Sequence, residues 1–424
     1  MSPQDGVRDE VGHIPGIDGL RGIAVLWVAL FHFIVLRPGD AATGAIVASP
    51  AGPLAANGYL GVDLFFLISG FLLAMPWFVH EAGHRAHPSA IAFYRRRFWR
   101  IVPAYYVQLA ILFAIVLPLL HGTRFWRSDL WVYLYNLFAH VLFLHNTTPL
   151  SSGSMQANGA LWTLAVEAQF YLLLPIAMPL VVRWPRASLA VAIACAQAWR
   201  MASDTGLAPL VQLETWLGRP WQWPEAVVRY LLAHQLPSYL GHFALGIFLG
   251  RAWLARSARS THPHALDAGA ALAIVALGIS LARNWPTGPL AWTVAPLALA
   301  VLLYASAREG TWISAALSRG PLAFVGRASY SMYLYHLPML IVLAPALDAL
   351  HVAALPAYLA AAILAGWISW RFVERPWMRG RPRAGLAARA AADGEGRRDG
   401  EPLEGGHAPQ HLREATRVHE GAEH

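Results

Sequence analysis

The chain has 424 residues, of which 57% are hydrophobic and only 13% are charged. An ordinary soluble domain carries about 25% charged residues, so the composition excludes that class and indicates a protein built for lipid. The formal net charge of +8 reflects basic residues that are all arginine and lie mainly at the ends of apolar segments, which favours membrane topology over nucleic-acid binding.

Apolar runs long enough to cross a hydrocarbon layer of about 30 Å as helices recur along the chain. Because the runs do not alternate between apolar and polar residues, a barrel is disfavoured. They predict an all-α integral membrane protein with about ten transmembrane helices, at 20–38, 58–80, 102–120, 161–182, 187–202, 231–250, 265–283, 288–306, 326–347 and 355–376. We expect a cytoplasmic leader at 1–15, a transmembrane domain at 16–380 and a disordered cytoplasmic tail at 381–424.

The arginine-rich loops orient these spans, because arginine favours the cytoplasmic side of a membrane. With ten spans, the clusters at 85–100, 183–186, 251–259, 308–327 and 375–383 all fall on one side. Both termini are therefore predicted to be cytoplasmic. The stretch 130–144 is short and contains polar residues, so we interpret it as interfacial or re-entrant. Counting it as a span would place most later arginines outside.

Two ionisable residues lie on the first span. Arg21 and His32 are eleven residues apart, close to three helical turns, so they share one face. With the N-terminus inside, Arg21 lies at the cytoplasmic mouth and His32 about 16 Å further in, near the midplane. Charged groups inside membranes are costly and are functional candidates, although a histidine that only hydrogen-bonds a neighbouring helix is an equal alternative.

A second histidine, His336, lies at a similar depth in the ninth predicted span, which suggests a polar cavity shared with His32. Asp63 and Glu167 open the second and fourth spans and are placed in the outer half. Asp63 can orient a histidine, as a carboxylate does in hydrolytic triads, and Glu167 can do likewise or bind an acceptor hydroxyl. For both acids the alternative is a buried pair that fixes helix packing.

Four arginines occupy six positions at the cytoplasmic end of the third span, more than orientation requires. Among them, Arg97 and Arg100 are i, i+3 neighbours on a helix and can grip one phosphate together, because guanidinium groups bind phosphates bidentately. Contact with lipid headgroups is the alternative. The single cysteine, Cys195, excludes a disulfide framework, and we expect no metal ion and no tightly bound cofactor.

At these residues the sequence resembles membrane acyltransferase family 3, whose bacterial members O-acylate surface polysaccharides and other acceptors. Its pattern of a basic residue, ten residues and a histidine is met by Arg21 and His32, and its Arg-x-x-Arg pattern by Arg97 and Arg100. Four further blocks match, at 61–71, 162–171, 329–338 and 372–376. One departure is Ala168, where family members often have a second acid; it puts in doubt only a secondary role there.

The resemblance implies transfer of an acyl group, commonly acetyl, from cytoplasmic acyl-CoA to a hydroxyl, with His32 as the catalytic residue. Arg21, Arg97 and Arg100 would then hold the CoA phosphates, while His32 acts as a general base or carries the acyl group itself. The expected location is the bacterial cytoplasmic (inner) membrane. The acceptor is left open among a surface glycan, a lipid-linked sugar and a secondary metabolite. A transporter with midplane proton- or substrate-binding histidines is the main alternative.

Overall fold

The computed structural model describes residues 14–83, 86–122, 130–148, 150–151, 157–204, 225–256, 260–284 and 291–379. All regular elements in these ranges are helices, which confirms the predicted all-α class. Helical stretches long and apolar enough to cross a membrane are Pro15–Leu36, Leu60–Glu81, Ala90–His121, Gly159–Arg183, Pro263–Arg283, Ser329–Asp348 and His351–Met378. The protein is therefore a multi-pass membrane protein. The count of ten spans and the cytoplasmic termini stay predictions, and nearly all of the predicted leader and all of the tail lie outside the described residues.

The other three predicted spans correspond to less apolar or shorter helices. Residues 187–202 form most of α11 (Pro185–Asp204), which carries Arg200. The stretch 231–250 divides into α13 (Glu225–Ala233) and α14 (Leu236–Leu254), with a proline in the first turn of α14. Residues 288–306 form α16 (Ala291–Ala307). Helix α9 (Leu130–Val141) has 12 residues, or about 18 Å, which is shorter than the hydrocarbon layer.

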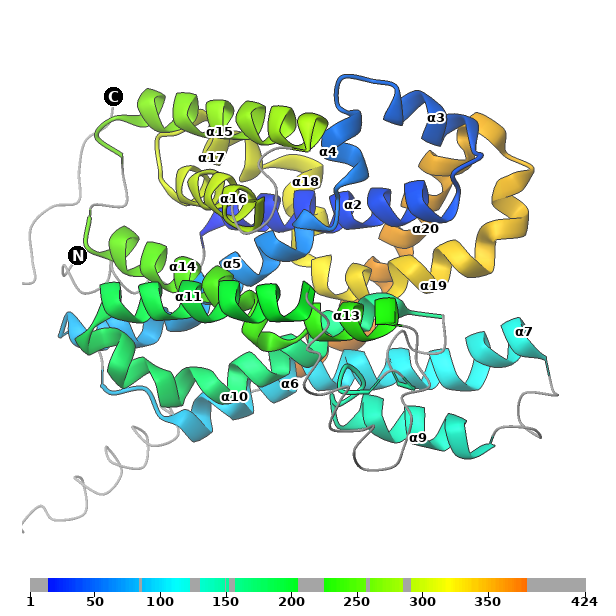
Figure 1. Cartoon of the computed structure of the whole chain (residues 1–424), viewed down its shortest axis with the longest axis horizontal. Helices are drawn as coiled ribbons and strands as arrows, with labels where there is room; N and C mark the ends of the chain where they lie inside the picture. Colours follow the sequence, from blue (N-terminus) through cyan, green and yellow to red (C-terminus); the bar gives the residue numbers. More distant parts are fainter. Residues whose placement is uncertain are drawn as a thin grey trace, which may run out of the picture. The chain divides into compact units, whose positions relative to one another are not determined.

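Helix α2 (Pro15–Leu36) runs through the middle of the described part of the chain, with α15 (Pro263–Arg283), α16, α17 (Trp312–Leu317) and α18 (Gly320–Arg327) above it in Figure 1. Glycines let this apolar helix approach its neighbours closely. A Cβ atom on Gly19 would collide with the carbonyl of Leu317, and one on Gly22 with the carbonyl of Leu322. Small residues at such interfaces are how membrane helices pack, because lipid supplies no hydrophobic drive between them.

Helices α5 (Leu60–Glu81) and α14 are packed in the same way, below α2 in Figure 1. A Cβ on Gly70 of α5 would meet the carbonyl of Phe243, and a Cβ on Gly246 of α14 would meet the carbonyl of Leu67. The two backbones therefore touch at reciprocal glycines. The remaining elements are α3 (Ala41–Val47), α4 (Gly52–Ala56), α6 (Ala90–Ile111), the π-helix η1 (Leu112–Val116), α7 (Leu117–His121), the 3₁₀ turn η3 (Gly159–Leu161) and α10 (Trp162–Arg183).

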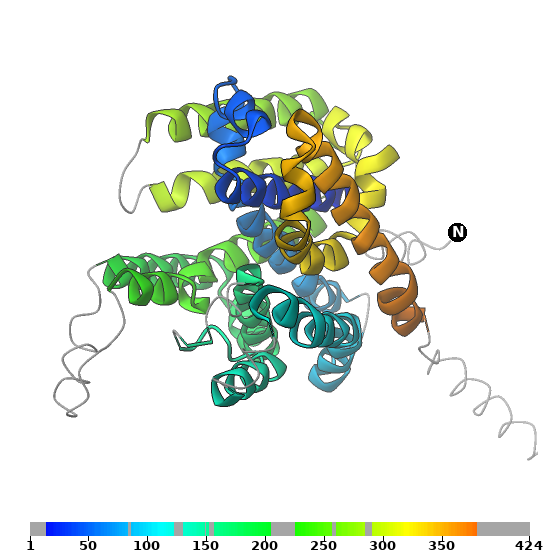
Figure 2. The same cartoon turned by 90° about the vertical axis from the view of Figure 1, so that its right-hand side faces the viewer.

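Toward the end of the chain, α19 (Ser329–Asp348) and α20 (Ala354–Ser369) form an antiparallel pair joined by the 3₁₀ turn η5 (His351–Ala353), and Figure 2 shows this pair beside α2. A π-helix, η6 (Trp370–Glu374), and α21 (Arg375–Arg379) follow. The buried Glu374 accepts a hydrogen bond from Ser331 at 2.9 Å, and Trp377 stacks on Trp99 of α6 with ring centroids 5.0 Å apart. These contacts bring α6, α19 and α21 together around one cavity.

Candidate active site

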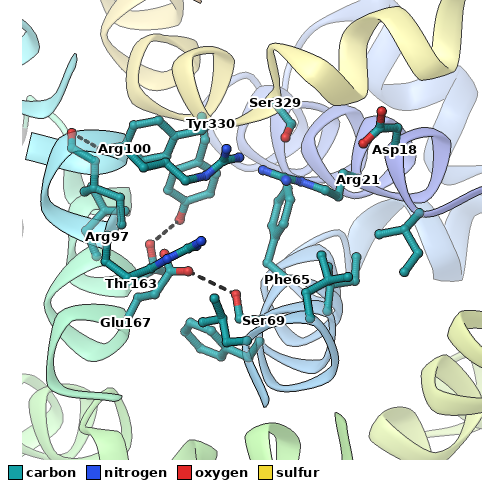
Figure 3. A pocket seen from close by; sticks show the side chains of 18 of the residues that line it. Asp18, Arg21, Phe65, Ser69, Arg97, Arg100, Thr163, Glu167, Ser329 and Tyr330 are labelled. Carbon is teal, nitrogen blue, oxygen red and sulfur yellow. Dashed lines mark hydrogen bonds between the residues drawn. The ribbon is translucent and has the colours of Figure 1, made fainter. Parts of the chain in front are cut away.

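A cavity of about 510 Å³ opens between α2, α5, α6, α10 and α19, and α18, η6 and α21 complete its wall. Arg21, Arg97, Arg100 and Arg327 line it together with two carboxylates, Asp18 and Glu167. Four arginines against two acids give the lining a formal excess of two positive charges. Figure 3 shows the guanidinium groups of Arg21, Arg97 and Arg100 turned into the same space. We call this space the arginine cavity.

Among the described residues, carboxylates near these arginines, such as Glu167 and Glu374, interact with them electrostatically without forming ion pairs. In the described part of the chain, none of the four forms an ion pair with a carboxylate. The Nε atoms of Arg21 and Arg97 are buried and lack hydrogen-bond partners. Arg100 Nη1 donates to the sulfur of Met378 at 3.4 Å, and a thioether sulfur is a weak acceptor. Unpaired guanidinium groups that converge on one space are suited to an anionic ligand.

Glu167 lies in the arginine cavity. Its carboxylate accepts a hydrogen bond from Ser69 Oγ at 3.0 Å, and Tyr171, one turn further along α10, also lines the cavity. The Tyr171 ring lies 6.0 Å from the guanidinium carbon of Arg97, a cation–π distance. The acid is thus beside the predicted phosphate-binding residues, and not beside either predicted catalytic histidine.

His32 and His336 lie next to each other. His336 Nε2 is 3.3 Å from His32 Nδ1, and the two ring centroids are 5.0 Å apart. Each ring also contacts its own helix: His32 Nδ1 is 2.9 Å from the carbonyl of Val28, and His336 Nδ1 is 2.7 Å from the carbonyl of Tyr333. His336 is fully buried, whereas His32 is partly exposed. The structure therefore places the two histidines together, and their catalytic roles stay predictions.

Tyr333 contacts both the arginine cavity and the histidine pair. Its side chain lines the cavity, and its ring centroid is 5.2 Å from that of His336. The hydroxyl donates to the carbonyl of Ala160 at 3.0 Å and accepts from Thr163 Oγ1 at 2.9 Å. One aromatic ring, held by polar contacts from η3 and the start of α10, thus contacts both the arginine cavity and the histidine pair.

Asp63 pairs with a histidine that the sequence analysis did not single out. Asp63 Oδ2 lies 3.5 Å from Nε2 of His242 on α14, whose side chain is only 4% exposed. Because successive residues turn by about 100° on a helix, Asp63 faces the side of α5 opposite Phe65, which lines the arginine cavity. The signal that could have identified His242 is its position inside an apolar run, the argument used for His32.

Arg327 and Tyr333 are the other site residues that sequence reasoning passed over. Arg327 was interpreted as a topology-setting loop residue, but it ends α18 and lines the cavity with an exposed side chain. Tyr333 lies within the 329–338 block, yet nothing in its sequence context distinguishes it from the neighbouring Tyr330 and Tyr335.

Comparisons with known proteins identify the family of this chain. The profile of a family described as "Acyltransferase domain" matches residues 14–372. ExoZ, an exopolysaccharide production protein of Rhizobium meliloti, is 30% identical over 79% of this chain and 95% of its own length. BcsY of Komagataeibacter xylinus is 29% identical over 88% of this chain and 85% of its own length.

A third relative is the peptidoglycan O-acetyltransferase OatA of Listeria monocytogenes, 24% identical over 86% of this chain. The match spans only 56% of that protein's length. No solved structure matches the chain. Acyltransferases are enzymes, so the matches favour an enzyme over the transporter that intramembrane histidines alone would also allow. The chain belongs to acyltransferase family 3, a family of membrane enzymes that includes O-acetyltransferases of cell-surface polymers.

Proposed function

We propose that this protein transfers an acyl group, acetyl in the simplest case, from acyl-CoA to a hydroxyl of a glycan, with His32 as the catalytic residue. The observation that carries the proposal is the arginine cavity, whose wall includes the ring of Tyr333, a ring that also contacts His336 of the His32–His336 pair. A donor with an anionic end and a thioester at the other end suits this layout, because the arginines can bind the anionic end while the histidines act on the thioester end.

The anionic end of the donor is assigned to the arginines. CoA carries its phosphates on the nucleotide half of the molecule, and guanidinium groups bind phosphate oxygens in a bidentate way. Arg97 and Arg100 come from one turn of α6, Arg21 from α2, and Arg327 adds a fourth charge from α18. By the positive-inside argument this end of the site faces the cytoplasm, where acyl-CoA is available, and the membrane is the bacterial inner membrane.

The reactive end is assigned to the histidines. The pantetheine arm would extend past Tyr333 toward His32, whose partial exposure leaves it reachable. His32 then removes the proton of the acceptor hydroxyl as a general base. Transient acylation of the histidine is the alternative mechanism. Asp63 has a carboxylate suited to orienting an imidazole, and its partner in this role is His242.

The acceptor class follows from the relatives. ExoZ is named for exopolysaccharide production and OatA for peptidoglycan O-acetylation, so a hydroxyl of a surface glycan or of its lipid-linked precursor is the acceptor we propose. A secondary metabolite remains the third acceptor to include in an assay.

The test uses the full chain in lipid nanodiscs with radiolabelled acetyl-CoA and a panel of glycan, lipid-linked sugar and small-molecule acceptors. Label should pass to an acceptor hydroxyl with the wild-type protein and fall to background with His32→Ala. The matched control is His264→Ala, since His264 is exposed at the start of α15. Transfer that survives His32→Ala in correctly inserted protein would overturn the assignment, and label trapped on His32 in a single turnover would favour the acyl-histidine route.

A further inference from the structure

The hydrogen-bonding contacts of the histidine pair define which ring nitrogens carry protons. His336 Nδ1 lies 2.7 Å from the carbonyl oxygen of Tyr333. A carbonyl oxygen can only accept, so this nitrogen must bear hydrogen. His336 is fully buried, and in the described part of the chain it has no carboxylate partner, which makes a second proton on the ring costly. Its Nε2 therefore presents a lone pair.

His32 is held by its own helix in the same way. Its Nδ1 lies 2.9 Å from the carbonyl oxygen of Val28 and must also carry a proton. The contact of 3.3 Å between His32 Nδ1 and His336 Nε2 then joins a donor to a lone pair. One N–H is shared between the Val28 carbonyl and the His336 ring. In neutral His32 the nitrogen without hydrogen is consequently Nε2.

We propose that His336 is a positioning residue: together with the Val28 carbonyl it accepts from Nδ1–H of His32, and so holds the ring orientation and the tautomer in which His32 Nε2 is the reacting atom. This inference rests on the proposed acyl transfer and names the atom that performs it. His336 acts through His32 because the His336 ring is fully buried, whereas the His32 ring is partly exposed. Of the two histidines, only His32 has exposed surface for a substrate to contact. In hydrolytic triads a carboxylate occupies the position that His336 occupies here.

The proton and electron pairs balance in this scheme. The acceptor O–H bond breaks and its proton goes to His32 Nε2. The freed oxygen pair forms the new C–O bond at the acyl carbon, and the C–S bond breaks with its electron pair on sulfur. The Nε2 proton then passes to that thiolate, which leaves as free CoA thiol. Between these steps His32 is an imidazolium whose Nδ1–H is held by His336 and by the Val28 carbonyl.

The tautomer can be read without any substrate. Full-length protein labelled with ¹⁵N-histidine is placed in nanodiscs, and the His32 signals are identified by subtracting the spectrum of His32→Ala. We expect one unprotonated ring nitrogen, assigned to Nε2, and a protonated Nδ1. A protonated Nε2 in the wild-type protein overturns the inference, whatever the protein's activity.

Kinetics of two variants supply the second readout. His336→Gln places an amide oxygen near the Nε2 position, whereas His336→Leu has similar bulk and no acceptor. We expect His336→Leu to lower kcat about 10- to 100-fold with little change in the KM for acyl-CoA, and His336→Gln to recover most of kcat. Equal kcat in wild type and His336→Leu, or equal losses in both variants, contradicts a positioning role. If Nε2 is unprotonated but His32→Ala still transfers label, the proposed function fails while the tautomer stands.

Discussion

Replacing Arg97 tests the donor assignment most directly. Its Nε is buried without a partner, it has no carboxylate ion pair in the described chain, and it lines the arginine cavity. A charge-assisted hydrogen bond contributes about 1.5–3 kcal/mol, and a value near 2 kcal/mol corresponds to roughly a 30-fold change in affinity. We therefore expect Arg97→Ala to weaken CoA binding about 30-fold. Arg95, exposed on the same helix and outside the cavity, provides the control, and Arg95→Ala should change binding less than about twofold.

The assay is calorimetric titration of nanodisc-embedded protein with CoA and, separately, with pantetheine, which lacks the phosphates. If Arg97 binds a phosphate, its replacement weakens CoA binding and leaves pantetheine binding unchanged. The KM for acyl-CoA should rise while kcat changes little, because the lost interaction is present in both ground state and transition state. Equal losses for Arg97→Ala and Arg95→Ala, or an equal loss with pantetheine, would refute the phosphate assignment.

Two further predictions concern stability. Gly70→Ala puts a Cβ against the carbonyl of Phe243 and should destabilise the protein by about 1–3 kcal/mol at the α5–α14 contact. The control is Gly269→Ala in α15, where a Cβ meets nothing within 4 Å, and this change should not lower the melting temperature. Equal melting temperatures for the two variants would contradict this packing. Burial lowers the pKa of His145, in the turn after α9, to about 4, so the unfolded chain binds more protons below pH 6.5 and stability should fall by up to about 3 kcal/mol as pH drops from 6.5 to 4. His145→Gln, which keeps a donor for the carbonyl of Leu161, should flatten this pH dependence of the melting temperature, and an unchanged slope would count against it.

Features that depend on a single helix were predictable from the sequence. Arg21 and His32 share a face because eleven residues make close to three turns, and Arg97 and Arg100 are neighbours because they are three positions apart. The structure keeps both relations, with Arg21, Arg97 and Arg100 all in one cavity. Helix existence was equally accessible, since long apolar runs leave the backbone no alternative within lipid.

Features that depend on two helices were not predictable, because depth along the membrane normal does not specify rotation about a helix axis. Equal depth suggested a shared cavity for His32 and His336. That the two rings touch, although the residues are 304 positions apart in the sequence, became evident only in the structure. Depth alone also grouped Asp63 with Glu167. In the structure, Asp63 faces His242 on α14, whereas Glu167 accepts a hydrogen bond from Ser69 in the arginine cavity.

The geometry of the whole site rests on two helices that run between its ends. Helix α2 carries Arg21 in the cavity and His32 at the histidine pair, and α19 carries Tyr333 at the cavity wall and His336 one turn further. Because a helix rises 1.5 Å per residue, the distance between the two ends on α2 is set at about 16 Å by the backbone itself. What remains adjustable is the lateral position of α2, and the close contacts at its glycines against α17 and α18 remove that freedom. A larger residue at Gly22 would therefore change transfer without touching any substrate, since it would displace both ends of the site together.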